Sequence, residues 1–156
     1  MIVTFTVRSG QGEPSAFDRG DIVFSGELGE ASSVGHVPDQ GMMLFLAVPD
    51  LLDSLVALLG RRSTSASFTG IGSAYRLDFH TKKQTVTVKG RSGPVAQVSH
   101  AELAGAVLSA AEELASRHLA PPPPGDPAAD DYAAALNRFR AAAVQAGARR
   151  PGAGDG

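Results

Sequence analysis

The sequence contains no cysteine and no tryptophan, and its aromatic residues are seven phenylalanines and two tyrosines among 156 residues. The absence of cysteine excludes disulfides, thiolate metal sites and a cysteine nucleophile. Because aromatic residues are scarce and much of the 43% apolar content is alanine, we expect a modest, mostly aliphatic core. A chain of this length fits one domain of ordinary size.

Signals for secretion or membrane insertion are also missing. Residues 1–5 have no basic region and begin no long apolar run, so no secretory signal is expected. The most hydrophobic stretch, residues 42–59, carries Pro49, Asp50 and Asp53, and charges inside a bilayer are strongly unfavourable. We therefore expect a cytoplasmic protein without a membrane partner.

The clearest structural signal is an antiparallel hairpin. Apolar and polar residues alternate over 75–80 and again over 85–89, with a short polar segment between the two runs. This period of two is typical of paired strands with one buried face. Tyr75, Leu77 and Phe79 should lie on the buried face. The solvated face is expected to carry Arg76, Asp78, His80, Thr85, Thr87 and Lys89.

Other strands and two helices are predicted from shorter patterns. The strands are expected at residues 2–8, 21–25, 42–48 and 94–98, and residues 61–74 are expected to form a loop. Pro49 should begin a helix over 49–59, which Gly60 can close in a left-handed cap. Ser99 and Glu102 have capping-box spacing and should begin a second helix over 99–119.

The chain is expected to form a single α+β domain over residues 1–120. We predict a mainly antiparallel sheet of about five or six strands, with the helices at 49–59 and 99–119 packed on one face. A proline-rich linker over 121–126, an amphipathic helix over 127–147 and a disordered tail over 148–156 follow. One face of this last helix carries the residues expected to dock it on its own domain or on another subunit: Tyr132, Leu136 and Phe139.

Charge is unevenly distributed along the chain. Residues 1–60 contain two basic and eight acidic residues and have a charge of −6. Residues 61–91 contain seven basic residues and one acidic residue and have a charge of +6. The remaining residues contain five basic and seven acidic residues and have a charge of −2. The basic segment can face the acidic one within the fold or bind a partner. The candidate partner-binding residues are Arg61, Arg62, Arg76, Lys82, Lys83, Lys89 and Arg91. Phosphate contacts by this segment make nucleic-acid association an alternative function.

The sequence offers little for catalysis, and it predicts neither a metal nor a cofactor. The candidate bases or ligands are the four histidines, none of which has zinc-motif spacing: His36, His80, His100 and His118. Asp78 and His80 share one face of a strand and could form a base with its orienting group, so a small enzyme remains a second alternative. A pairing of Asp78 with a lysine on the next strand is the simpler interpretation.

These observations favour a non-catalytic interaction or regulatory module that binds a protein partner or a second copy of itself. The layout of short antiparallel strands and helices is similar to that of small bacterial immunity and antitoxin-like proteins. That similarity is one of layout, and no motif in the sequence carries it.

Overall fold

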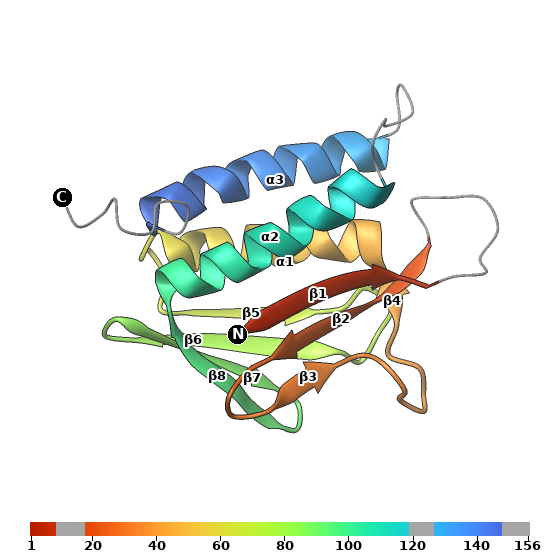
Figure 1. Ribbon diagram of the computed structural model, residues 1–156, viewed down its shortest axis with the longest axis horizontal. Coiled ribbons are helices and arrows are strands. Elements are labelled where there is room, and N and C mark those ends of the chain that lie inside the picture. Colours follow the sequence, from red (N-terminus) through yellow and green to blue (C-terminus); the bar gives the residue numbers. More distant parts are fainter. Residues whose placement is uncertain (9–17, 119–126, 148–156) are drawn as a thin grey trace.

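The structure is a computed structural model of the chain, and it describes residues 1–8, 18–118 and 127–147. Within these residues, two four-stranded antiparallel sheets lie below three helices (Figure 1). The α+β class is therefore confirmed. The number of sheets differs from the prediction, because the strands divide into two groups instead of forming one sheet of five or six.

The first sheet is built around β2 (Arg19–Ser25). One side of β2 pairs with β1 (Ile2–Val7), and its other side pairs with both β3 (Glu30–Ser32) and β4 (Met42–Met43). Consequently β1 is an edge strand among the strands that the structure describes. Its side chains alternate between the solvent and the space beneath the helices, as the spacing of apolar residues requires.

The second sheet is a meander of β5 (Ser65–Thr69), β6 (Arg76–Lys82), β7 (Thr85–Gly90) and β8 (Gly93–Ser99). The predicted hairpin is confirmed as β6 and β7, whose inner residues are buried while the polar residues between them are half-buried or exposed. The expectation of a loop at 61–74 was wrong, because β5 lies there. The sequence pattern does not indicate this strand, because most of its residues are small and polar and only Phe68 is fully buried.

The helix α1 (Leu44–Leu59) begins five residues before Pro49, so the predicted strand at 42–48 is wrong beyond β4. An unbroken apolar run suits a helix buried on most sides as well as a buried strand. Pro49 is tolerated inside α1 although it cannot donate a backbone hydrogen bond. The left-handed residue after the helix is Arg61, with φ of 59°, and not Gly60.

The helix α2 (His100–His118) follows β8 directly, and the backbone N–H of Glu102 donates to Ser99 Oγ at 3.0 Å, as half of the predicted capping box requires. The helix α3 (Pro127–Gln145) then packs across α1 and α2 (Figure 1). Tyr132, Leu136 and Phe139 are all buried in this contact, so α3 docks on its own domain. The predicted linker and tail lie outside the described residues.

The core lies between the helices and the inner faces of both sheets. Phe24 of β2 meets Phe79 of β6 edge to face, with ring centroids 6.1 Å apart, and so connects the two sheets. Above them, Phe45 of α1 contacts Tyr132 of α3 in the same manner, at 6.2 Å. Tyr132 also donates from its hydroxyl to the carbonyl of Ala111 at 2.7 Å. These aromatic residues thus connect the two sheets to each other, and α3 to both α1 and α2.

Candidate functional site

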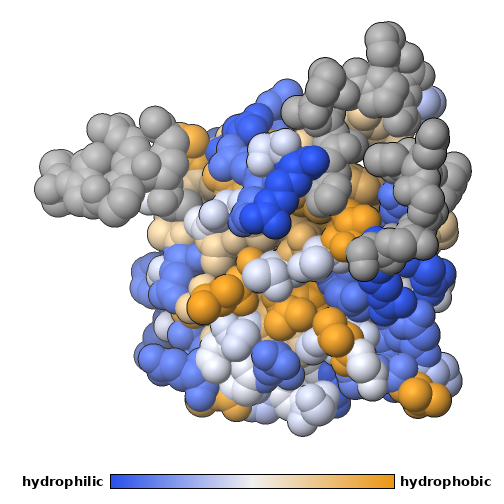
Figure 2. All heavy atoms as spheres, turned by 45° about the vertical axis from the view of Figure 1, so that its right-hand side comes forward, coloured by the Kyte–Doolittle hydropathy of each residue, from blue (hydrophilic) through white to orange (hydrophobic). Residues whose placement is uncertain are grey.

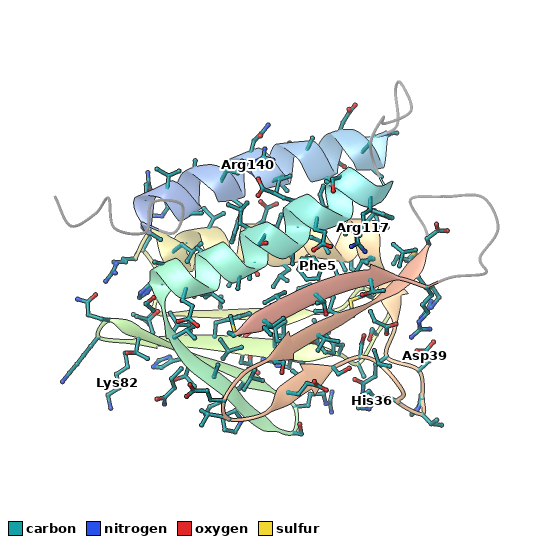
Figure 3. The ribbon with its side chains drawn as sticks, in the orientation of Figure 1. Phe5, His36, Asp39, Lys82, Arg117 and Arg140 are labelled. Atoms are coloured by element: carbon teal, nitrogen blue, oxygen red, sulfur yellow. The ribbon has the colours of Figure 1, made fainter. Side chains whose placement is uncertain are left out.

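A groove runs between the edge strand β1 and the helix α2. It encloses about 350 Å³ and is lined by residues 3–7 of β1 and by Ala110, Glu113, Leu114 and Arg117 of α2. In Figure 3 the labelled Phe5 and Arg117 mark its two sides, one on the strand and one on the helix. Figure 2 turns this part of the molecule forward and shows hydrophobic side chains reaching the surface below the helices.

The backbone of β1 points hydrogen-bonding groups into this groove. Arg8 N–H donates to the carbonyl of Arg19 at 3.0 Å, which fixes the phase of the β1–β2 ladder. In an antiparallel pair, successive residues point their N–H and C=O groups alternately toward and away from the partner strand. The groups of Thr4 and Thr6 therefore face β2, and those of the odd-numbered residues face outward: Val3, Phe5 and Val7.

Among the described residues, the strand β1 lacks several features that commonly protect a sheet edge. Its sequence, IVTFTV, contains no lysine, proline or glycine, and its ladder with β2 runs without a bulge. Natural edge strands are normally blunted by such features, because a row of open backbone groups can pair with another chain. The side chain of Ile2 is also 68% exposed beside this edge. No described strand pairs with the outer side of β1, so its outward backbone groups are candidates for pairing with another chain.

The helix side of the groove combines small apolar residues with a charged rim. Ala110 and Leu114 are buried at its floor. Arg117 and Glu113, one helical turn apart, form an exposed ion pair at 2.6 Å. A segment lying in the groove would therefore meet apolar surface beneath it and both signs of charge at its outer border.

An ion-pair network holds the carboxyl end of β1 in place. Arg8 Nε and Nη2 donate to Asp21 at 2.9 and 3.0 Å, and its Nη1 and Nη2 donate to Asp39 at 2.9 and 2.8 Å. Hydrogen bonds from Arg8 hold the pKa of the Asp39 carboxyl well below its usual range and also lower the pKa of Asp21. The buried hydroxyl of Ser33 donates to Asp21 at 2.7 Å. These groups are engaged with one another and fix the strand end.

The candidate partner-binding residues lie in two groups. Lys82 and Lys83 lie at the β6–β7 turn, where Arg61 donates to Gln84 at 3.1 Å, and Arg62 follows Arg61 in the chain. Arg76 and Arg91 lie at the opposite end of the hairpin, with Lys89 next to them on β7. Six residues of extended strand separate Arg76 from Lys82 by about 20 Å. The seven residues are therefore spread along the length of the hairpin.

Asp78 and His80 do share a shallow groove on the solvated face of the second sheet, with residues such as Ser67 and Thr87. Arg76 donates to Asp78 at 2.9 Å, and Ser67 donates at 2.8 Å. The hydrogen bonds from Arg76 lower the pKa of Asp78. A carboxylate held ionised in this way is poorly matched to general-base catalysis near neutral pH.

The other histidines lie apart from this groove. His36 accompanies Glu30, Arg76 and Arg91 in a separate polar pocket of about 440 Å³, and its Nε2 lies 2.7 Å from the carbonyl of Ser32. His100 is buried at the start of α2. His118 ends α2. Across the described residues, no three histidine, aspartate or glutamate side chains are grouped so that they could hold a metal ion.

No protein-family model, curated protein or solved structure matches this chain. Among the helices of the described segments, none has the length and apolarity needed to cross a membrane. The function must therefore be argued from the residues themselves. Sequence reasoning missed the groove because alternation along residues 2–7 predicts a strand but does not reveal that the strand lies at an edge.

Proposed function

We propose that the protein is a non-catalytic interaction module that binds an extended segment of a protein partner by strand addition to β1. The observation that carries this proposal is the row of outward backbone groups on Val3, Phe5 and Val7 beside an open groove. In strand addition, such main-chain groups provide affinity, and pockets for alternate side chains provide specificity.

The geometry of β1 defines the kind of segment that fits. Residues of an added strand directly opposite Val3, Phe5 and Val7 would point their side chains in the same direction, toward α2. There they would meet Ala110 and Leu114. The intervening residues would lie beside Thr4 and Thr6 in solvent. We therefore expect a ligand with small or medium apolar side chains at every second position.

A selection from a displayed library of random octapeptides tests this proposal. Enriched peptides should alternate apolar and polar residues, and their binding should depend on the open edge. Val7→Pro removes one outward N–H and leaves the β1–β2 ladder intact, because Val7 donates nothing to β2. We expect this variant to bind the selected peptides at least about tenfold more weakly, which corresponds to about 1.4 kcal/mol.

The matched control is Val7→Thr, which keeps both the β-branched shape and the N–H and should bind as the wild type does. Thermal unfolding of each variant verifies that the fold is retained. Peptides that bind Val7→Pro as tightly as wild type would contradict strand addition at this edge, and so would a selection without any enrichment.

A further inference from the structure

We infer that the strand accepted by β1 is the β1 strand of a second copy of this chain, so that the protein forms a two-fold symmetric dimer. This inference rests on the proposed function, since it names the partner of the same groove. Pairing of two β1 strands would join two four-stranded sheets into one continuous sheet of eight strands. Such an interface is isologous, which means that one surface must be complementary to itself.

The register of β1 meets this requirement. Its outward backbone groups lie on Val3, Phe5 and Val7, which are symmetric about Phe5. Two antiparallel copies centred at Phe5 pair Val3 with Val7 of the partner subunit, and each pair exchanges both hydrogen bonds. All outward groups of these three residues are then satisfied in both copies.

The solvent side of the same strand supports this register. Thr4 would lie opposite Thr6 of the partner subunit, a pairing of hydroxyl residues that is favourable between neighbouring strands. The exposed Ile2 would lie opposite Arg8 of the partner subunit, whose guanidinium is fixed by Asp21 and Asp39. No two like charges of β1 face each other in this arrangement.

The helix side is also self-complementary. The two-fold axis would bring α2 beside its symmetry mate in antiparallel orientation, because α2 borders the groove. Glu113 and Arg117 carry opposite charges at the border of the groove. The two-fold axis would place this pair opposite the same pair of the second copy in reverse order, so that unlike charges can face each other. Binding of a different protein would not require β1 and α2 to be complementary to themselves, so this complementarity favours a second copy.

Disulfide trapping gives a direct test, because the natural chain contains no cysteine. Thr4→Cys and Thr6→Cys proteins are mixed under mild oxidation. Directly opposite, non-hydrogen-bonded residues have Cβ atoms close enough for a disulfide after small adjustments. We expect a covalent dimer that contains one copy of each variant. A mixture of Thr85→Cys and Thr87→Cys, on the solvated face of β7, is the control and should remain uncrosslinked.

A charge exchange on α2 tests the same interface independently. Glu113→Arg gives both rims two positive residues, so its dimer dissociation constant should rise at least about fivefold in sedimentation analysis. The double variant Glu113→Arg with Arg117→Glu restores one charge of each sign and should recover the wild-type constant. Both positions are exposed and should leave thermal unfolding nearly unchanged.

The outcomes separate this inference from the proposed function. A chain that stays monomeric and untrapped, yet binds selected peptides in a Val7-dependent manner, overturns the dimer and leaves strand addition standing. A monomer that binds no peptide overturns both. A dimer that forms without the Thr4–Thr6 disulfide, and that ignores the charge exchange and Val7→Pro, uses another surface and also overturns the inference.

Discussion

Arg61 and Lys83 adopt a left-handed backbone conformation, each with φ of 59°. At Arg61 this conformation ends α1, because its N–H donates to Leu58 and the N–H of Arg62 donates to Ala57. This hydrogen-bond pattern usually has glycine at the left-handed position. Side chains other than glycine are strained there by about 1 kcal/mol or more.

Replacing Arg61 with glycine should therefore stabilise the protein. We expect Arg61→Gly to raise the free energy of unfolding by about 0.5–1 kcal/mol, because relief of strain exceeds the added freedom of the unfolded chain. Urea denaturation measures the change. Arg62→Gly is the matched control, since Arg62 has no positive φ and should lose stability. Equal effects of the two substitutions would show that backbone strain is not the cause.

His100 is a buried titratable residue, and one of its two ring nitrogens has no hydrogen-bond partner. Its Nε2 lies 3.2 Å from Thr81 Oγ1, and its Nδ1 is the one buried side-chain nitrogen or oxygen of the described residues without a hydrogen-bond partner. Burial lowers the pKa of His100, and the positive charge of Arg61 lowers it further. The neutral imidazole is thus the form that fits the fold.

This lowered pKa gives stability a defined pH dependence. The unfolded chain binds a proton at His100 near pH 6.5, whereas the folded chain binds it only at lower pH. The free energy of unfolding should therefore be constant above about pH 7 and fall as the pH drops from 6.5 toward the lowered value. His100→Gln should flatten this part of the curve, because it removes the group that titrates there. A curve that His100→Gln leaves unchanged would contradict the assignment.

At the scale of single elements, the open edge of β1 has a spectroscopic signature. In dilute protein, the amides of Thr4 and Thr6 should be protected from hydrogen exchange, because they face β2, and those of Phe5 and Val7 should exchange rapidly. At concentrations that favour association, Phe5 and Val7 should become protected as well. Amides of the central strand β2 are the internal control, and the reverse alternation would refute the orientation.

The elements also show where sequence patterns suffice. The β6–β7 hairpin was predictable because its residues alternate strictly, and α2 because Ser99 provides a cap at its start. The start of α1 was not predictable, since a helix covered by α3 and β5 is apolar around most of its circumference. Pro49 then favoured the wrong boundary, because proline is commoner in the first turn than inside a helix.

At the scale of the whole molecule, α3 acts as part of the core. Phe139 is fully buried, and its truncation to alanine should lower the free energy of unfolding by about 3–5 kcal/mol. Calorimetry or urea denaturation checks this value. Arg140→Ala is the neighbouring control: it removes an exposed ion pair with Glu112 and should cost about 1 kcal/mol at most. A small loss at Phe139 would mean that α3 docks only weakly.

The docking face of α3 could be predicted from sequence, because Tyr132, Leu136 and Phe139 recur at helical spacing. The groove could not, because it depends on which strand of the first sheet lies at the edge and on which helix borders it. Neither fact can be read from neighbouring residues in the sequence. The strand β1 pairs with β2, and α2 lies over β1 although it follows about 100 residues later in the chain. The basic residues illustrate the same limit, since Arg76 and Lys82 of one strand lie at opposite ends of the hairpin.

The docking of α3 on α1 also has a consequence for synthesis. Arg138 of α3 binds Asp53 of α1 across 85 residues of sequence. At about 5–20 residues per second, the ribosome adds that length in roughly 4–17 s. Once α1 has left the tunnel, its leucine-rich segment stays uncovered until α3 has been translated. The nascent chain therefore offers a hydrophobic segment that chaperones can bind, and native packing of α1 is completed only after α3 emerges.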